Sequence, residues 1–190
     1  RIIIHGKERK INSPSDALKA GIAYLSEDRK RYGVAIGLDV ETNISMANLR
    51  NMSKFGFIKF KECAVNADKQ LDDLAIKTPS VKQLVKFLSG GNQQKVVLAK
   101  WLTRDAEIII FDEPTRGIDV GAKSEIYKLM NALAERGKTI IVISSELPEI
   151  IRCCHRVLVM CEGRLTGEVT GEDIDQDIMM KFAPQRSKGE

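Results

Sequence analysis

The sequence has few of the residues that build metal centres or membrane spans. Its 190 residues include two histidines and four cysteines, and no two cysteines are spaced as Cys-x-x-Cys. This composition argues against a zinc site or a redox motif and favours reduced cysteines that pack as small core residues in a cytosolic protein. The purely apolar runs are a few residues long, whereas a membrane helix needs about 20. We therefore expect a globular domain without a membrane span.

Charge of one sign is also scarce. The chain has 30 basic and 26 acidic residues, which gives a net charge of +4 that is spread along the sequence. Binding to nucleic acid requires basic residues gathered on one face. We therefore expect no nucleic-acid partner.

The most informative stretch is Leu88–Lys95, which reads Leu-Ser-Gly-Gly-Asn-Gln-Gln-Lys. Ser89 has the side chain of a helix N-cap, and two glycines allow a ligand to approach the backbone closely. Residues 93–104 are good helix formers with an apolar stripe. A helix N-terminus carries free N–H groups and about half a positive charge. The stretch therefore predicts a phosphate site at Ser89, Gly90 and Gly91.

A second stretch, Glu107–Pro114, is an apolar strand that ends in two adjacent carboxylates, Asp112 and Glu113. A carboxylate at the carboxyl end of a buried strand can hold Mg²⁺, and a second can orient an attacking water. A phosphate cradle combined with a metal-binding carboxylate indicates a nucleoside triphosphate with Mg²⁺.

Strands and helices alternate along the chain, which favours an α/β sheet. The run 138–143 is almost continuously apolar, so we expect a strand buried on both faces of a parallel sheet. The turn signals and periodicity predict strands at 1–4, 9–11, 22–25, 107–111, 138–143, 156–161 and 164–169. They predict a charged loop at 26–33 and a short turn at 81–88. Helices are predicted after Ser13 with Gly21 as C-cap, at 40–49, 61–76, 93–104, 120–136 and 172–182, and from the end of the lead-in Ser144–Glu146 to about Arg152.

The glycine-rich loop Gly-x-x-x-x-Gly-Lys-Ser/Thr, which such a protein needs between a strand and a helix, is missing. The nearest match, Ala132–Thr139, begins with alanine and runs from a helix into a strand. A phosphate there would face the negative end of a helix dipole. We interpret Gly137 as a helix C-cap instead.

The two stretches together resemble the signature motif and the Walker B strand of ABC-type ATPases, with Asp119 placed like the D-loop aspartate. Segments 26–31, 88–95 and 112–123 further resemble the second nucleotide-binding domain of bacterial importers of ribose, galactose and xylose. The resemblance extends to about Phe182. It implies an ABC-type P-loop NTPase fold with a mainly parallel core sheet and a helical subdomain. We expect a chain truncated before its Walker A loop and amino-terminal strands.

The resemblance also implies a role for each residue at a matching position. ATP held on an opposite ABC domain would be bound through its γ-phosphate at the signature motif. Asp112 would serve Mg²⁺, Glu113 would polarise the attacking water, and Asp119 would lie at the interface between the two domains. The implied nucleotide-binding residues are Ser89, Gly90, Gly91 and Gln93.

Two positions depart from the family pattern. Glu27 occupies the place of the Q-loop glutamine, where a carboxylate could also bind Mg²⁺. Ser145 stands where the switch histidine is expected, and serine lacks the second nitrogen of an imidazole. The site built on this domain's own carboxylates is therefore expected to be weak, and the fragment alone inactive, while its signature motif completes the site of the partner.

The resemblance divides the chain into four parts. Residues 1–37 would be the remnant of the amino-terminal β part, 38–88 the helical subdomain, 89–183 the ATPase core and 184–190 a polar tail. The helical subdomain would dock on a membrane permease, and a second ABC domain would be fused ahead of this one. The protein would lie peripherally on the cytoplasmic face of the membrane.

Two other interpretations stay open. The carboxyl-terminal lobe of an SMC-type chromosome or repair ATPase also has a signature and a Walker B motif without Walker A. Such lobes are attached to coiled coils, and no apolar heptad pattern is sustained here. The chain could also be a catalytically inert ABC domain kept for dimer geometry.

Overall fold

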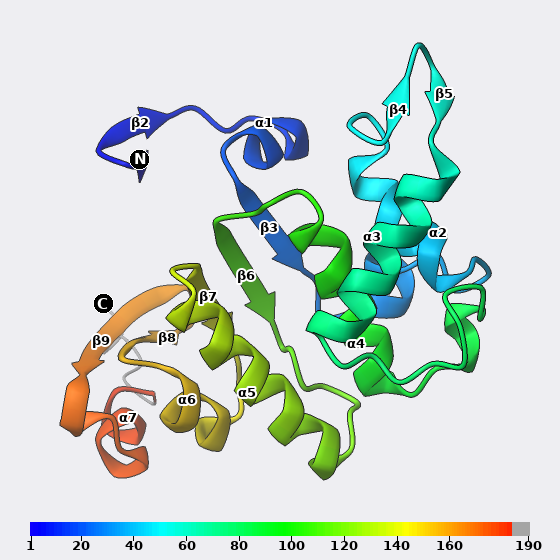
Figure 1. The fold of residues 1–190 in the computed structure, drawn as a ribbon. Coiled ribbons are helices and arrows are strands. Elements are labelled where there is room, and N and C mark those ends of the chain that lie inside the picture. The colour runs from blue at the N-terminus through cyan, green and yellow to red at the C-terminus, as the bar shows by residue number, and fades with distance from the viewer. Residues whose placement is uncertain (184–190) are drawn as a thin grey trace. The chain divides into compact units, whose positions relative to one another are not determined.

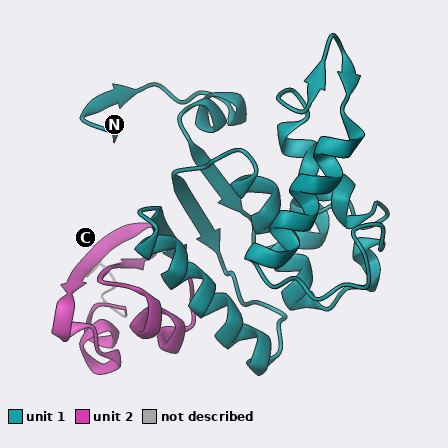
Figure 2. Ribbon diagram, viewed as in Figure 1, with its two compact units in different colours: residues 1–143 teal, residues 144–190 magenta. Residues whose placement is uncertain are grey.

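The computed structural model describes residues 1–183, and the predicted tail 184–190 lies outside the described residues. The chain forms two compact units, residues 1–143 and residues 144–190 (Figure 2). The expected boundaries at residues 37 and 88 do not coincide with this division and stay a prediction. No helix among the described residues is long and apolar enough to cross a membrane.

The first unit contains a parallel sheet in the order β3-β6-β7 (Figure 1). Its strands are β3 (Ile22–Leu25), β6 (Ile108–Asp112) and β7 (Thr139–Ile143). Pairing aligns Leu25 with Phe111, and Phe111 with Val142. Alternate residues such as Leu25, Ile109 and Phe111 are almost fully buried, so one face of the sheet forms the core. The parallel sheet expected from the sequence is confirmed.

The prediction that the last of these strands is buried on both faces is wrong. Ile141 and Ile143 of β7 are 46% and 50% exposed. The reason is that only the face bearing alternate residues such as Val142 is turned toward the core, whereas the other face, which also carries the half-exposed Tyr24, is largely uncovered. A continuous apolar run does not by itself report which of its two faces is covered.

The amino-terminal hairpin consists of β1 (Ile2–Ile4) and β2 (Lys7–Arg9). Helix α1 (Pro14–Lys19) begins as expected, because the Ser13 side chain accepts a hydrogen bond from the backbone N–H of Asp16. Its C-cap is Ala20, and Gly21 follows at φ +76° rather than serving as the cap itself. A π-helix, η1 (Arg29–Gly33), replaces part of the predicted charged loop.

The region 38–88 is helical with interruptions, as predicted, but its details differ. The predicted helix 40–49 is α-helical only in α2 (Val40–Ser45) and continues as the 3₁₀ turn η2 (Met46–Asn48). Helix α3 (Phe60–Asp73) packs against α2, and the turn η3 (Val85–Phe87) precedes the signature motif. A hairpin that the sequence analysis missed, β4 (Ser53–Lys54) and β5 (Phe57–Ile58), joins the two helices (Figure 1).

Two longer helices complete the first unit. Helix α4 (Gly90–Leu102) begins three residues before the predicted start, directly after Ser89. Helix α5 (Val120–Glu135) follows the Walker B strand and ends before Gly137, whose φ of +83° fits the expected helix stop. Contacts join α4 to β3 and α5 to β7, so both helices pack on the sheet.

The second unit contains helix α6 (Leu147–Cys153) and the antiparallel strands β8 (Arg156–Cys161) and β9 (Arg164–Thr170). The 3₁₀ turn η4 (Gly171–Asp173) leads into α7 (Gln176–Phe182), so the helix predicted at 172–182 begins later than expected. All four cysteines are free. Burial raises the pKa of the Cys153 thiol to about 11, which keeps it protonated at neutral pH.

Candidate functional site

The carboxyl end of the parallel sheet carries the two predicted acidic residues. Asp112 is the last residue of β6, and the backbone N–H of Glu113 donates to the carbonyl of Ile143 at 2.8 Å. Glu113 has φ +45°, a left-handed conformation that is uncommon for a residue with a side chain. Strained backbone of this kind gathers at functional sites, because the surrounding structure must hold it in place.

Tyr24 of β3 is a neighbour of Asp112 that the sequence analysis missed. Its hydroxyl donates to Asp112 Oδ2 at 2.5 Å. This hydrogen bond is the main reason why the pKa of the Tyr24 phenol is raised, and partial burial of the ring adds to the shift. The signal was present in the pattern, since two parallel strands with Tyr24 opposite Ile110 place tyrosine and aspartate on the same face.

The signature motif forms the N-terminus of α4. The Ser89 hydroxyl caps this helix by accepting from the backbone N–H of Asn92 at 3.4 Å and from Asn92 Nδ2 at 3.0 Å. Ser89 is exposed, and Gly90 and Gly91 are the first two residues of the helix. The predicted cap is therefore confirmed, and the helix N-terminus is open to an anion on the Ser89 side.

The two signature glycines are required by packing within the protein. A Cβ on Gly91 would lie 2.8 Å from Cβ of Ala122, in helix α5. A Cβ on Gly90 would lie 2.7 Å from Nη2 of Arg29 and 3.2 Å from the carbonyl oxygen of Gly117. Packing against neighbouring protein atoms therefore accounts for glycine at both positions, and the expected approach of a ligand to their backbone stays a prediction.

Gln93 is turned away from the open end of the helix. It is 5% exposed, and its Nε2 donates to the carbonyls of Val85 and Leu88, each at 3.2 Å. These bonds hold the turn that leads into the signature motif. The geometry gives Gln93 a structural role, and its predicted contact with nucleotide gains no support.

Arg29 joins three functional segments and was not singled out by the sequence analysis. Its Nη1 donates to the carbonyl of Arg116 at 2.8 Å and its Nη2 to that of Gly117 at 3.3 Å. The same guanidinium lies against Gly90. Burial lowers the pKa of Arg29, although Asp28 opposes the shift, and arginine stays charged at any physiological pH. The π-helix, the signature motif and the segment after Walker B are thus held by one side chain.

Glu27 forms an ion pair with Arg116. Both side chains are substantially exposed, so the pair is worth little for stability, but it supplies a partner for the carboxylate that replaces the Q-loop glutamine. A cation at Glu27 would have to compete with this guanidinium. The predicted role of Glu27 in binding Mg²⁺ therefore gains no support from the geometry.

Asp119 is the N-cap of helix α5. Its side chain accepts from the backbone N–H of Ala122 at 2.9 Å. The next residue, Val120, is 84% exposed, so the start of α5 presents an uncovered apolar side chain. An exposed cap next to an exposed valine is compatible with the predicted interface.

We expect Asp119→Ala to lower the stability of the chain by about 1 kcal/mol, because it removes the cap. Asp119→Asn should keep the stability within a few tenths of a kcal/mol, because asparagine caps equally well. Chemical denaturation of both variants measures the difference. Equal losses for alanine and asparagine would mean that the charge, and not the cap, matters in the isolated chain.

Ser145 follows β7 by two residues and belongs to the second compact unit. Its side chain is exposed. The neighbouring Ser144 hydroxyl accepts from the backbone N–H of Glu146 at 3.0 Å. The role assigned to Ser145 at the switch position stays a prediction.

The acidic residues do not form a metal site by themselves. Within residues 1–183, no group of three or more histidine, cysteine, aspartate or glutamate side chains could hold a metal ion. Mg²⁺ at a nucleotide site needs only one or two carboxylates, because phosphates and waters supply the other ligands. A single carboxylate at Asp112 therefore fits an ion that arrives with a nucleotide and does not fit a resident metal.

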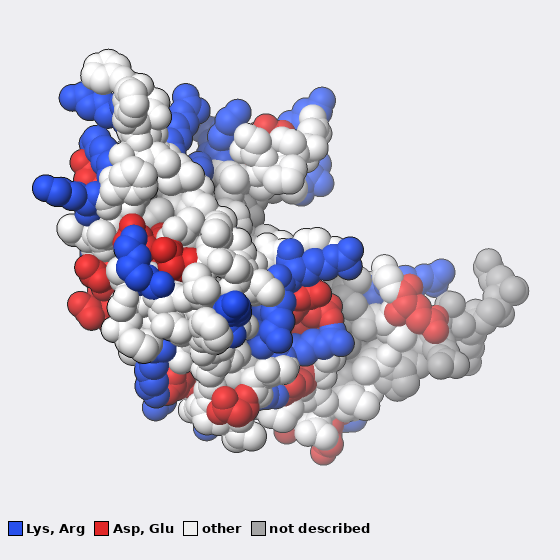
Figure 3. All heavy atoms as spheres, turned by 90° about the vertical axis from the view of Figure 1, so that its right-hand side faces the viewer, with Lys and Arg blue, Asp and Glu red and all other residues white. Residues whose placement is uncertain are grey.

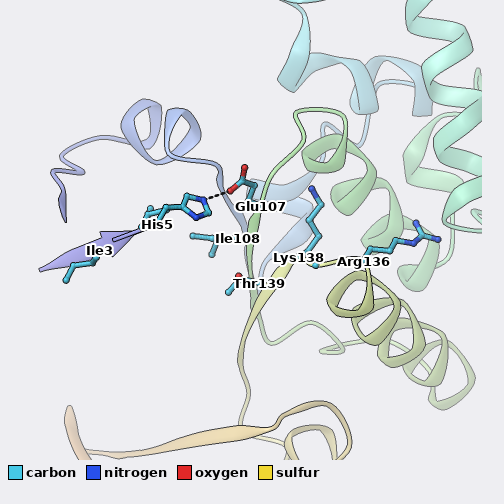
Figure 4. Close-up of a pocket in the computed structure, with 9 residues that line it drawn as sticks. Ile3, His5, Glu107, Ile108, Arg136, Lys138 and Thr139 are labelled. Atoms are coloured by element: carbon cyan, nitrogen blue, oxygen red, sulfur yellow. Dashed lines mark hydrogen bonds and ion pairs between the residues drawn. The ribbon is translucent and has the colours of Figure 1, made fainter. Parts of the chain in front are cut away.

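A cavity of about 370 Å³ lies at the opposite, amino end of the sheet, where it is lined in part by Ile108 and Thr139. His5 and Glu107 meet there at 2.7 Å (Figure 4). Arg136 points away from this pair in the same view. Its charged groups have partners within the protein, since His5 pairs with Glu107 and Lys138 with Asp105 at 2.9 Å. The cavity lies at the strand end remote from Asp112.

Comparison with known proteins agrees with this architecture. The family model described as "ABC transporter" matches residues 1–116. The chain belongs to the ABC transporter family. A protein named as a ribose/galactose/methyl galactoside import ATP-binding protein of Burkholderia lata is 56% identical over 186 residues, which is 97% of this chain and 36% of that protein. The xylose import ATP-binding protein of Thermoanaerobacter pseudethanolicus is 54% identical over 182 residues, 96% of this chain and again 36% of the relative.

Solved structures show the same fold. A nucleotide-free ATP-binding cassette from an ABC transporter aligns with a TM-score of 0.73 at 20% identity, covering 93% of this chain and 70% of that one. A dimeric ATP-binding cassette bound to ADP and Pi aligns with a TM-score of 0.70 at 19% identity, covering 88% and 72%. The ABC-type α/β fold is therefore confirmed. This ABC chain spans about a third of the length of the curated relatives that it matches.

Proposed function

We propose that this chain is part of the ATP-binding subunit of a sugar importer and that it donates its signature motif to ATP bound on a partner ABC domain. The observation that carries the proposal is the exposed, capped N-terminus of α4 at Ser89. Arg29 packs against Gly90 and Ala122 against Gly91, and these contacts fix the position of the helix end. Relatives more than 50% identical carry names as sugar import ATP-binding proteins, which favours an importer over a chromosome ATPase.

In this proposal the γ-phosphate of ATP rests against the helix N-terminus at Ser89, Gly90 and Gly91. The free N–H groups and the helix dipole supply the attraction. Asp119 and the exposed Val120 face the partner domain, which is fused ahead of this one in the same polypeptide. The segment 38–88 contacts a membrane permease, so that the protein lies peripherally on the cytoplasmic face of the membrane.

The site that would use this chain's own carboxylates is proposed to be weak, and the isolated fragment to be inactive. ATP would bring the Mg²⁺, and Asp112 would be its protein ligand while Glu113 would orient water. Three observations support a weak site. Asp112 already accepts from Tyr24, Glu27 is paired with Arg116, and serine stands at position 145 in place of an imidazole.

The test uses the longer polypeptide that carries this chain and compares two variants. Ser89→Asp keeps an N-cap of equal quality but places a negative charge where the phosphate would bind, so ATPase activity should fall by on the order of a hundredfold. Glu113→Gln should leave most of the turnover. The melting temperature of Ser89→Asp should match that of the parent, which shows that the loss does not come from unfolding.

Each variant can contradict a different part of the proposal. Unchanged turnover in Ser89→Asp would exclude donation of the signature motif. Loss of all turnover in Glu113→Gln would mean that this domain's own site hydrolyses ATP. A catalytically inert domain kept for dimer geometry also predicts that a negative charge at the signature motif abolishes turnover. It differs from the proposal in predicting that Glu113→Gln changes nothing at all, so a partial loss of turnover in Glu113→Gln would exclude it.

A further inference from the structure

The hairpin β4–β5 exposes an unusual number of aromatic side chains. It stands out from helices α2 and α3 (Figure 1). Phe55 is 90% exposed, Phe57 80% and Phe60, at the start of α3, 71%. Scattered apolar residues on a surface are normal, but several at one protruding point mark a site of interaction.

The same segment is rich in positive charge. Residues 50–61 contain four basic residues and no acidic one, so the rest of the sequence has as many acidic as basic residues and is neutral. This stretch is therefore more basic than the chain as a whole, as is the run Arg29–Arg31. Figure 3 shows Lys and Arg side chains around the uncharged tip of the hairpin. The four basic residues are Arg50, Lys54, Lys59 and Lys61. Lys59 is paired with Glu62, the residue that follows this stretch, at 2.7 Å, so Arg50, Lys54 and Lys61 are the residues that would meet lipid phosphates.

The turn of the hairpin is built at a cost to stability. Phe55 and Gly56 have φ values of +53° and +84°, the signs that a two-residue type I′ turn requires. Asparagine or glycine is preferred at the first position, and a bulky side chain there is strained. The Phe55 ring is exposed and gains little from packing inside the chain, apart from the Lys54 ammonium at 5.6 Å from its centroid. A strained and exposed aromatic residue indicates a partner that covers it.

We propose that the β4–β5 hairpin binds an anionic lipid surface, with its phenylalanine rings in the headgroup region and its lysines at the lipid phosphates. A convex tip presents no groove for a peptide, whereas exposed apolar rings flanked by basic side chains suit an anionic bilayer interface. Long lysine side chains can lay their methylene stems beside the rings and extend the ammonium outward. The proposal relies on the proposed function only for placing this chain beside a membrane.

The decisive variant is Phe55→Asn, because folding and lipid binding should respond in opposite directions. Asparagine followed by Gly56 is the preferred type I′ turn, so the melting temperature should stay equal or rise. Sedimentation of the 190-residue chain with phosphatidylglycerol–phosphatidylcholine vesicles should nevertheless weaken by about tenfold. Lys54→Ala should weaken it by about fivefold, and added salt should reduce the binding of the parent chain.

The matched control is Phe87→Ser. Phe87 is 66% exposed and has the Lys86 ammonium at 4.9 Å from its ring centroid, so it is a lysine–phenylalanine pair of the same kind on another element. Its replacement should leave vesicle binding unchanged. Vesicles of phosphatidylcholine alone should bind the parent chain at least tenfold more weakly than the anionic vesicles.

Three results would overturn the lipid proposal. The first is that the parent chain does not sediment with anionic vesicles. The second is that Phe55→Asn binds these vesicles as strongly as the parent chain. The third is that Phe87→Ser loses as much vesicle binding as Phe55→Asn. Binding that depends on Phe55 but occurs only with native membrane vesicles, and not with pure lipid, would assign the hairpin to a membrane protein instead. Pure vesicles contain no nucleotide and no partner domain, so failure here leaves the signature-motif test unaffected.

Discussion

The variant Gly91→Ala is expected to unfold more easily than the parent chain by about 1–3 kcal/mol, although alanine is the better helix former. The added Cβ would lie 2.8 Å from Cβ of Ala122, and neither atom belongs to a flexible side chain. Helices α4 and α5 must therefore move apart. Because the exposed end of α4 is the proposed phosphate site, the same shift should lower ATPase activity in the longer polypeptide.

A double-mutant cycle separates packing from ligand binding at this position. Ala122→Gly removes the methyl group that the new Cβ of Gly91→Ala would meet. Glycine at position 122 has its own cost in a helix, about 1 kcal/mol. After this cost is subtracted, the double variant should regain most of the stability that Gly91→Ala loses. Thermal and chemical denaturation of the four proteins gives the coupling. Additive losses would show that the helices accommodate the methyl group and that the glycine is required for another reason.

The recovery of ATPase activity in the double variant carries further information. If activity returns together with stability, Gly91 serves the packing of α4 on α5. If stability returns while activity stays low, the glycine is needed by the bound phosphate itself. Only the second explanation can be reached from the sequence, because the contact with Ala122 cannot be derived from the spacing of the two residues.

Local signals in the sequence were sufficient for many of the elements. Ser13 and Ser89 are N-caps, as the capping pattern indicates, and the apolar runs of the parallel sheet were located to within a residue at most ends. These features depend on backbone preferences over a few neighbouring residues. The β4–β5 hairpin was missed because two-residue strands are too short to show a period.

Contacts between distant segments could not be predicted in the same way. The hydrogen bond of Tyr24 to Asp112 joins residues 88 positions apart, and that of Arg29 to Arg116 spans 87. Both depend on which elements the fold makes adjacent. The exposure of Ile141 arises because it lies on the uncovered face of the sheet together with Tyr24, which sequence composition does not report.

Arg29→Ala is the second variant for which a large effect is expected. It removes two hydrogen bonds from a charged donor to the carbonyls of Arg116 and Gly117, and we expect the loss of about 1.5–3 kcal/mol of stability. Gly117 has φ +66°, so the segment forms a tight turn. The carbonyls of Arg116 and Gly117 accept from Arg29 in this turn and would lose that donor in the variant. In Arg29→Ala, the backbone amides at 116–119 should exchange with solvent faster than they do in the parent chain, and faster than those of α5.

Arg29→Lys tests whether the forked guanidinium is needed. Lysine keeps the positive charge but offers a single ammonium, which can reach one carbonyl where arginine reaches two, so it should restore less than half of the stability. Arg31→Ala is the matched control, since Arg31 lies in the same π-helix, is exposed and stacks only on Tyr32 at 5.2 Å. Hydrogen exchange should be unchanged in that control. Full rescue by lysine would mean that charge alone, without bidentate geometry, holds the signature motif against the segment after Walker B.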